Sequence, residues 1–134
     1  MKQELRLSGT GGQGLILAGI ILAEAALLDG KLAIQSQSYG PEARGGSSKS
    51  EVMISEEAIH FPKVTEPNLL LAMSQEAANK YSTDLSPESI LVTDSLFVSK
   101  LPAHTGKIYE LPITHSAKEI LGKALFANII ALGA

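Results

Sequence analysis

Two glycine-rich segments carry the residues whose types and spacing could do chemistry. The first, "GTGGQG", supplies Gly9, Gly11, Gly12, Gln13 and Gly14. Glycine lets the backbone turn sharply and lets a ligand approach it closely. A helix that follows such a turn directs free N–H groups and the positive end of its dipole at the ligand, and Gln13 adds a side-chain donor. The segment therefore predicts a site for a phosphate or another anion.

The same segment matches the dinucleotide-binding fingerprint G-x-G-x-x-G at Gly9, Gly11 and Gly14. That site also requires an acidic residue at the end of the second strand, where it holds the ribose hydroxyls. Here the sequence reads "QSQS" over residues 35–38, so the acid is absent. The pattern thus disfavours NAD or FAD. It leaves open an anionic ligand, a partner chain, or glycines that only allow the strand and helix to pack tightly.

The second segment, "SYGPEARGG", brings polar side chains into a loop bracketed by glycine. Its candidate binding residues are Tyr39, Gly40, Glu42, Arg44, Gly45 and Gly46. The Arg44 guanidinium beside two exposed backbone N–H groups could bind a phosphate or carboxylate in a bidentate manner. A surface ion pair between Arg44 and Glu42, of little energetic value, is the alternative.

Other groups give weaker signals. His60, His104 and His115 are scattered without metal-ligand spacing. Asp94 follows a predicted strand, where a turn cap is the expected role. The sequence has no Gly-x-Ser-x-Gly nucleophile motif. It therefore indicates a binding architecture with no catalytic residue and no metal site.

The elements that position these residues alternate along the chain. Strands are predicted over residues 4–8, 31–37, 48–55, 68–74, 90–95 and 107–113. The connection between the second and third strands lacks room for a crossover helix, so we expect these two strands to be antiparallel neighbours. A helix over 13–30 is apolar on most sides and should be largely buried, with Gly30 as its stop. Ser74 should cap a helix over 75–85, and a capping box of Ser116 and Glu119 should start a helix over 117–134.

This alternation predicts a single α/β domain over residues 1–134, a three-layer α/β/α fold with a mainly parallel, mixed sheet and a Rossmann-like glycine turn. Ligands of such sheets bind beyond the carboxyl ends of the strands. Both glycine-rich segments are predicted at such ends. The chain stops inside an apolar helical pattern, so we expect a natural product that continues further.

Composition excludes several classes. The 134 residues are 45% hydrophobic and 19% charged, with a net charge of −3, which does not favour nucleic acid. The chain has no cysteine, so it offers no thiolate ligands for zinc or iron–sulfur clusters. The amino terminus lacks the apolar stretch of a signal peptide, and the longest apolar run is too short to span a membrane. A cytoplasmic protein is expected.

The two segments together resemble the gamma subunit of 2-oxoacid:ferredoxin oxidoreductases. The resemblance rests on "GTGGQG", on "QSYGPEARGGSSKSEVMIS" and on "NLLLAMSQEA" at matching spacing, and it covers essentially the whole chain. It implies a share in a CoA-dependent oxidative decarboxylation of a 2-oxoacid that sends electrons to ferredoxin. It also implies alpha, beta and sometimes delta partner subunits, which carry the thiamine diphosphate and the iron–sulfur clusters.

In this resemblance the gamma unit is associated with assembly and with coenzyme A, so both loops become candidates for holding the phosphates of coenzyme A. The second loop is most like the 2-oxoglutarate type, although pyruvate and branched-chain types are similar. Two alternatives stay open: a free-standing nucleotide-binding protein, and a purely structural subunit whose loop 39–46 docks a neighbouring chain.

Overall fold

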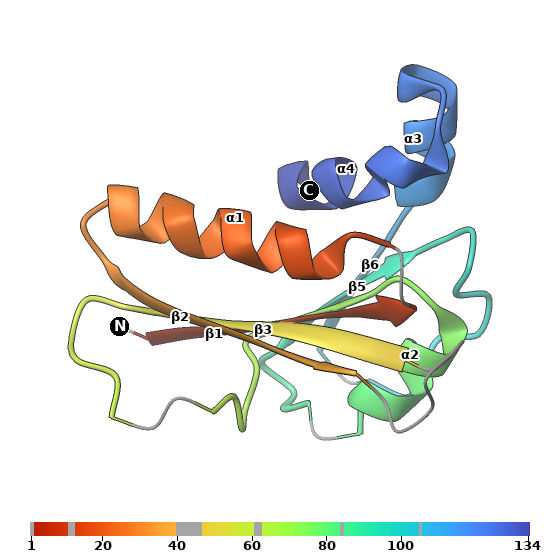
Figure 1. Ribbon diagram of the computed structural model, residues 1–134. Coiled ribbons are helices and arrows are strands. Elements are labelled where there is room, and N and C mark those ends of the chain that lie inside the picture. Colours follow the sequence, from red (N-terminus) through yellow and green to blue (C-terminus); the bar gives the residue numbers. More distant parts are fainter. Residues whose placement is uncertain (1, 11–12, 40–46, 61–62, 84, 105) are drawn as a thin grey trace.

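The computed structural model describes residues 2–10, 13–39, 47–60, 63–83, 85–104 and 106–134 (Figure 1). Its strands are β1 (Lys2–Thr10), β2 (Leu32–Tyr39), β3 (Ser47–Ser55), β4 (Leu69–Ala72), β5 (Ile90–Asp94) and β6 (Lys107–Leu111). Its helices are α1 (Leu15–Leu28), α2 (Gln75–Tyr81), α3 (Ile113–Leu121) and α4 (Ala127–Gly133), with a 3₁₀ turn at Ala124–Phe126 between the last two. Among these helices none combines the length and the apolarity needed to cross a membrane.

The strands form one mixed sheet in the order β2-β3-β1-β4-β5-β6. The β1–β4, β4–β5 and β5–β6 pairs are parallel. The β2–β3 and β3–β1 pairs are antiparallel, which confirms the expectation for the second and third strands. Because β3 runs against all the others, its first residue lies at the edge where β1 and β2 end. We call this edge, where the parallel strands end, the carboxyl edge.

Helices cover both faces of the sheet, as the three-layer prediction requires. In Figure 1, α1, α3 and α4 lie on one face and α2 lies on the other. Side chains alternate between these faces along each strand. Leu71 of β4 joins Leu7, Leu15 and Ile113 in the core under α1. Its neighbour Leu70 joins the separate core beneath α2.

Helix α1 differs from the prediction of a largely buried helix. Its side toward the sheet is buried through Leu15, Ala18, Gly19, Ala23 and Ala26. Its outer face, which we define as Leu17, Ile20, Ile21, Leu27 and Leu28, is exposed by 37–91%. The prediction was wrong because the helix lies on a sheet face rather than between two layers. No described element of this chain covers the outer face.

The carboxyl-terminal region also departs from expectation. A single helix over 117–134 was predicted, but Gly122 ends α3 with φ of 81° and α4 begins only at Ala127. The proposed capping box was wrong, since Ser116 already lies inside α3 and Glu119 contacts His115 at 3.2 Å. The prediction for Ser74 was right: its hydroxyl accepts a hydrogen bond from the Ala77 N–H at 3.1 Å. Helix α2 ends at Tyr81, earlier than predicted.

Candidate anion-binding site

The first glycine-rich segment joins the end of β1 to the start of α1. Gly14 is the N-cap residue of α1, and its φ of 75° is one that residues with a side chain rarely adopt. As a glycine, Gly14 has no side chain that could cap the first turn of the helix. The leading N–H groups of α1 therefore lie beside the turn together with the positive end of the helix dipole. This local arrangement is the one that binds anions in other folds.

Gln13 folds back across the turn instead of pointing away from it. Its Oε1 accepts a hydrogen bond from the Thr10 N–H at 2.8 Å, and its Nε2 donates to the Met73 carbonyl at 3.0 Å. A Cβ atom at Gly9 would lie only 2.1 Å from that Oε1. Gly9 is thus a glycine because the Gln13 amide occupies the space of a side chain.

A second amide reaches the turn from α4. The Asn128 side chain is buried, and its Nδ2 donates to the Gly14 carbonyl at 3.3 Å. A Cβ atom at Gly14 would lie 2.6 Å from the same Nδ2. The sequence analysis gave no role to Asn128. Its contact joins residues 114 positions apart, which no local pattern predicts.

The second glycine-rich segment leaves the sheet beside the first. Residues 40–46 lie outside the described residues, as do Gly11 and Gly12, but both ends of the segment are placed. Tyr39 pairs with Ser48, and Ser47 pairs with Thr10. The end of β2 and the end of β1 therefore flank the start of β3, two strand spacings or about 10 Å apart. The described ends of the two segments that the sequence singled out therefore lie on neighbouring strands at the carboxyl edge.

Ser47 adds a polar group at this edge. It is buried, and its hydroxyl has no hydrogen-bond partner among the described residues. A buried polar atom without a partner is uncommon and calls for an explanation. The serine immediately follows the loop 40–46, so its hydroxyl belongs to the region where the ligand is expected.

Asp94, at the end of β5, serves the fold rather than this site. Its carboxylate accepts a hydrogen bond from the Leu96 N–H at 3.2 Å, which confirms the predicted turn cap. It also accepts from the hydroxyl and the N–H of Thr114. The carboxylate thus caps the start of α3 from a neighbouring strand, a function that the sequence did not reveal.

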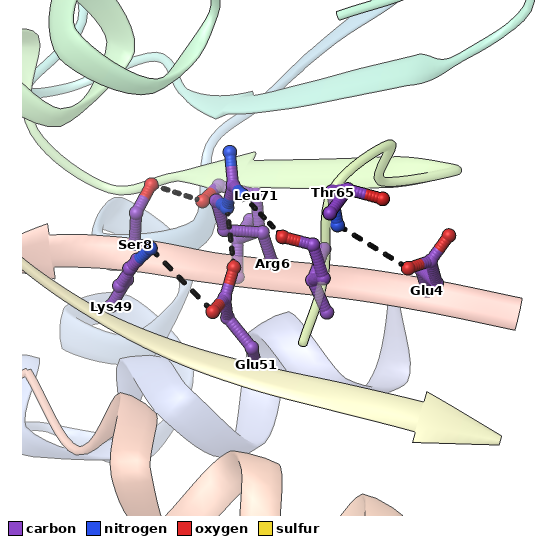
Figure 2. A network of polar contacts seen from close by, with 8 residues as sticks. Glu4, Arg6, Ser8, Lys49, Glu51, Thr65 and Leu71 are labelled. Carbon is purple, nitrogen blue, oxygen red and sulfur yellow. Dashed lines mark hydrogen bonds and ion pairs between the residues drawn. The ribbon is translucent and has the colours of Figure 1, made fainter. Parts of the chain in front are cut away.

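A polar network that the sequence analysis missed lies on the α2 face of β1 and β3 (Figure 2). Arg6 Nε donates to Glu51 Oε2 at 2.7 Å, and Lys49 Nζ lies 3.5 Å from Glu51 Oε1. The Arg6 guanidinium also reaches the Val64 carbonyl at 3.4 Å, and it lies 5.9 Å from the centre of the Tyr81 ring. Every second residue of β1 is polar from Lys2 to Thr10, a signal that normally indicates a solvated face. Here the Arg6–Glu51 pair is buried.

An apolar pocket of about 160 Å³, partly open to solvent, lies between the sheet, α1 and α4, away from the glycine turn. It is lined by Leu5, Leu7, Ala18, Leu22, Leu69, Leu71, Val92, Ala131, Leu132 and Ala134. Such a lining suits no phosphate. The described residues contain no group of three or more acidic or histidine side chains that could hold a metal ion. The candidate site is therefore the turn and loop at the carboxyl edge.

Comparison with known proteins decides the family. The model of the pyruvate ferredoxin/flavodoxin oxidoreductase family matches residues 4–134. The chain belongs to the pyruvate ferredoxin/flavodoxin oxidoreductase family. A relative in this family, the 2-oxoglutarate synthase subunit KorC of Methanocaldococcus jannaschii, is 51% identical over 137 residues that cover all of this chain and 73% of the relative.

Solved structures of pyruvate ferredoxin/flavodoxin oxidoreductase relatives share the fold. The gamma subunit of a keto/oxoacid ferredoxin oxidoreductase from Geobacter sulfurreducens superimposes with a TM-score of 0.90 at 51% identity, covering 99% of this chain and 73% of its own. The 2-oxoglutarate:ferredoxin oxidoreductase of Magnetococcus marinus, solved with 2-oxoglutarate, coenzyme A and succinyl-CoA bound, gives a TM-score of 0.88 at 25% identity. The match covers 99% of this chain and 23% of that one. In that protein the same fold is therefore one part of a much longer chain.

Proposed function

We propose that this chain is the gamma subunit of a 2-oxoacid:ferredoxin oxidoreductase that acts on 2-oxoglutarate, and that it holds the phosphates of coenzyme A. The complex would convert a 2-oxoacid, coenzyme A and oxidised ferredoxin into an acyl-CoA, carbon dioxide and reduced ferredoxin. The identity of 51% to a subunit named for 2-oxoglutarate supports this choice of substrate.

The observation that carries the coenzyme A proposal is that the described ends of the two glycine-rich segments lie at the carboxyl edge. The pairs Thr10–Ser47 and Tyr39–Ser48 bring these ends to neighbouring strands. The start of α1 after Gly14 offers backbone N–H donors, and the second segment contains Arg44 in its sequence. Coenzyme A presents a diphosphate and a 3′-phosphate, which both kinds of donor bind well.

Within the complex this chain would bind and orient coenzyme A, while partner subunits would carry out the redox chemistry. The chain has no cysteine, so its residues do not fit iron–sulfur clusters, whose usual ligands are cysteine thiolates. Thiamine diphosphate, held by other subunits, would supply the decarboxylation chemistry. By anchoring the phosphates, the glycine turn and the loop 40–46 would hold coenzyme A so that its thiol end reaches the partner's acyl group.

A second role in assembly is favoured by the outer face of α1. This face exposes five large apolar side chains in one helix, and Leu28 alone is 91% exposed. Exposed apolar patches of this kind mark interaction sites. We infer that a partner subunit covers the outer face of α1 in the complex. The two roles are compatible because the glycine turn and the outer face are different surfaces.

The test is CoA-dependent ferredoxin reduction with 2-oxoglutarate by the complex assembled from the full-length subunits. We expect Arg44→Ala to raise the KM for coenzyme A by about tenfold to a hundredfold, since a charge-assisted bidentate contact contributes roughly 1.5–3 kcal/mol. The kcat at saturating coenzyme A should change little. Lys107→Ala is the matched control, because this cation is exposed at the opposite edge of the sheet.

Other outcomes would point elsewhere. Loss of assembly without a change in the KM for coenzyme A would favour a purely structural loop. We expect no tight binding of NAD, because the sequence lacks the acidic residue that a dinucleotide site requires. If the chain bound NAD tightly, the proposal that the glycine turn holds coenzyme A would be contradicted. Faster turnover of pyruvate than of 2-oxoglutarate would contradict the choice of substrate.

A further inference from the structure

Gln13 occupies the centre of the glycine turn, although its amide is already engaged within the protein. It receives a hydrogen bond from Thr10 at the end of β1 and gives one to Met73 at the end of β4. These two strands are parallel neighbours in the sheet. The side chain therefore ties the first residue beyond β4 to the last residue of β1. Its geometry is that of a group that shapes the turn.

We propose that Gln13 is a positioning residue, which sets the affinity for coenzyme A by fixing the glycine turn rather than by binding the phosphates itself. This inference rests on the proposed function of the turn. The Thr10 N–H that Gln13 binds lies directly before the turn, and α1 begins two residues after Gln13. Without this amide, Thr10 and Gln13 lose the contacts that join them to one another and to Met73.

The close packing at Gly9 provides an independent argument. A Cβ atom there would come within 2.1 Å of Gln13 Oε1, well inside contact distance. The Leu15 Cδ1 and Met73 Cβ atoms would follow at 2.9 and 3.0 Å. The glycine and the glutamine are therefore complementary in shape. Gly9 is therefore needed because the Gln13 amide packs against it, and not because a dinucleotide approaches the backbone there.

Asn128 fixes the other end of the turn. Its Nδ2 donates to the Gly14 carbonyl, and that carbonyl also accepts the Ala18 N–H at 3.0 Å. The N-cap residue of α1 is thus held by α4 while Gln13 holds the side toward β4. Two amides from distant parts of the sequence fix the two ends of one turn, as expected when a binding loop must be preorganised.

The decisive variant is Gln13→Met, which keeps the length of the side chain and removes both hydrogen bonds. In the assembled complex we expect the KM for coenzyme A to rise about tenfold, the effect of losing two ordinary hydrogen bonds. The kcat at saturating coenzyme A should stay within about twofold, because the residue does not act on the reacting atoms. Faster amide hydrogen exchange is expected over residues 9–15.

Gly9→Ala should reproduce this phenotype, because the new methyl group displaces the Gln13 amide. The double variant should be far less impaired than the product of the two single effects, since both remove the same contact. Gln75→Met is the matched control. Gln75 likewise binds backbone atoms, at Ser99 and Lys100, but it belongs to the start of α2.

The outcomes separate this inference from the function on which it rests. If Arg44→Ala raises the KM for coenzyme A and Gln13→Met does not, the positioning role is overturned while the coenzyme A proposal stands. If neither variant changes that KM, both are overturned. An equal rise in KM for Gln75→Met would also overturn the inference, because the effect would then reflect general loosening. Strictly multiplicative effects of Gly9→Ala and Gln13→Met would refute the shared contact.

Discussion

At the scale of single residues, Arg6 and Glu51 show how the sheet carries buried charge. They are 5% and 8% exposed and contact one another at 2.7 Å. Breaking such a pair is costly because the buried Arg6 charge loses its contact with the Glu51 carboxylate. We expect Glu51→Leu to lower the free energy of unfolding by about 3 kcal/mol, measured by chemical denaturation of the purified chain.

Two further variants complete this test. Glu57→Leu, at an exposed position, should change stability by about 0.5 kcal/mol or less. Replacing both members, in Arg6→Met with Glu51→Leu, should restore most of the loss, since an apolar pair can substitute for a buried ion pair. A double variant as unstable as Glu51→Leu alone would show that the pair itself is not the cause.

The residue scale also marks the limit of prediction from sequence. The turn cap at Asp94 could be predicted because it depends on the N–H two residues further along. The contacts of Asp94 with Thr114 and of Asn128 with Gly14 could not, because tertiary structure brings these residues together. The burial of Glu4 and Arg6 could not be predicted either, because it also depends on tertiary structure. The segment 64–68 that contacts them is far along the chain.

At the scale of elements, the end of α3 gives a clean prediction. Gly122 has φ of 81°, and a Cβ atom there would meet nothing within 4 Å. Gly122→Ala should therefore destabilise the chain by about 1 kcal/mol through backbone strain alone. Gly133→Ala is the control, because that site is equally open without a positive φ. In thermal unfolding, Gly122→Ala should melt at a lower temperature than Gly133→Ala. Equal melting temperatures would contradict the strain argument.

The helices show where local signals suffice and where they fail. Ser74 was recognised because an N-cap bonds three residues along its own helix. The Ser116–Glu119 signal was misleading, since Asp94 caps α3 from another strand and the helix begins at Ile113. An apolar pattern on most sides of α1 predicted burial, but the pattern does not identify the element that covers each side. Among the described residues, only the inner side of α1 is covered.

At the scale of the whole molecule, the exposed outer face of α1 is the surface on which we propose that a partner subunit packs. We expect Leu28→Lys to weaken association with the partner subunits about tenfold, because a charge would enter an apolar contact. Stability of the separate chain should not change, since Leu28 is already 91% exposed. Co-purification and light scattering of the complex measure the effect.

Thr83→Lys is the matched control for this prediction, placing the same charge at an exposed site after α2. It should leave association intact. Equal association of Leu28→Lys and the unchanged chain would show that the partner covers a different surface.

The architecture as a whole was largely predictable, because strand and helix patterns alternate clearly and the antiparallel pair is local. The position of β3 between β2 and β1 was not predicted. That position alone brings the ends of the segment 40–46 to the strands beside the end of β1, so the candidate residues could be named from the sequence but not placed near one another. Assembly depends on the pairs Gly9–Ser48 and Thr10–Ser47, which span nearly forty residues.

The central place of β1 has a consequence for how the chain reaches its fold. β1 precedes both of its neighbours, so during synthesis it has neither until β3 is made over residues 47–55, and its other edge stays open until β4 is completed at residue 72. A strand in that position exposes two edges open to aggregation, and pairing across such separations is slow. Its alternating charges at Lys2, Glu4 and Arg6 keep one face of the waiting strand hydrated. Once β3 is made, Arg6 of this face becomes the buried partner of Glu51 in the mature sheet.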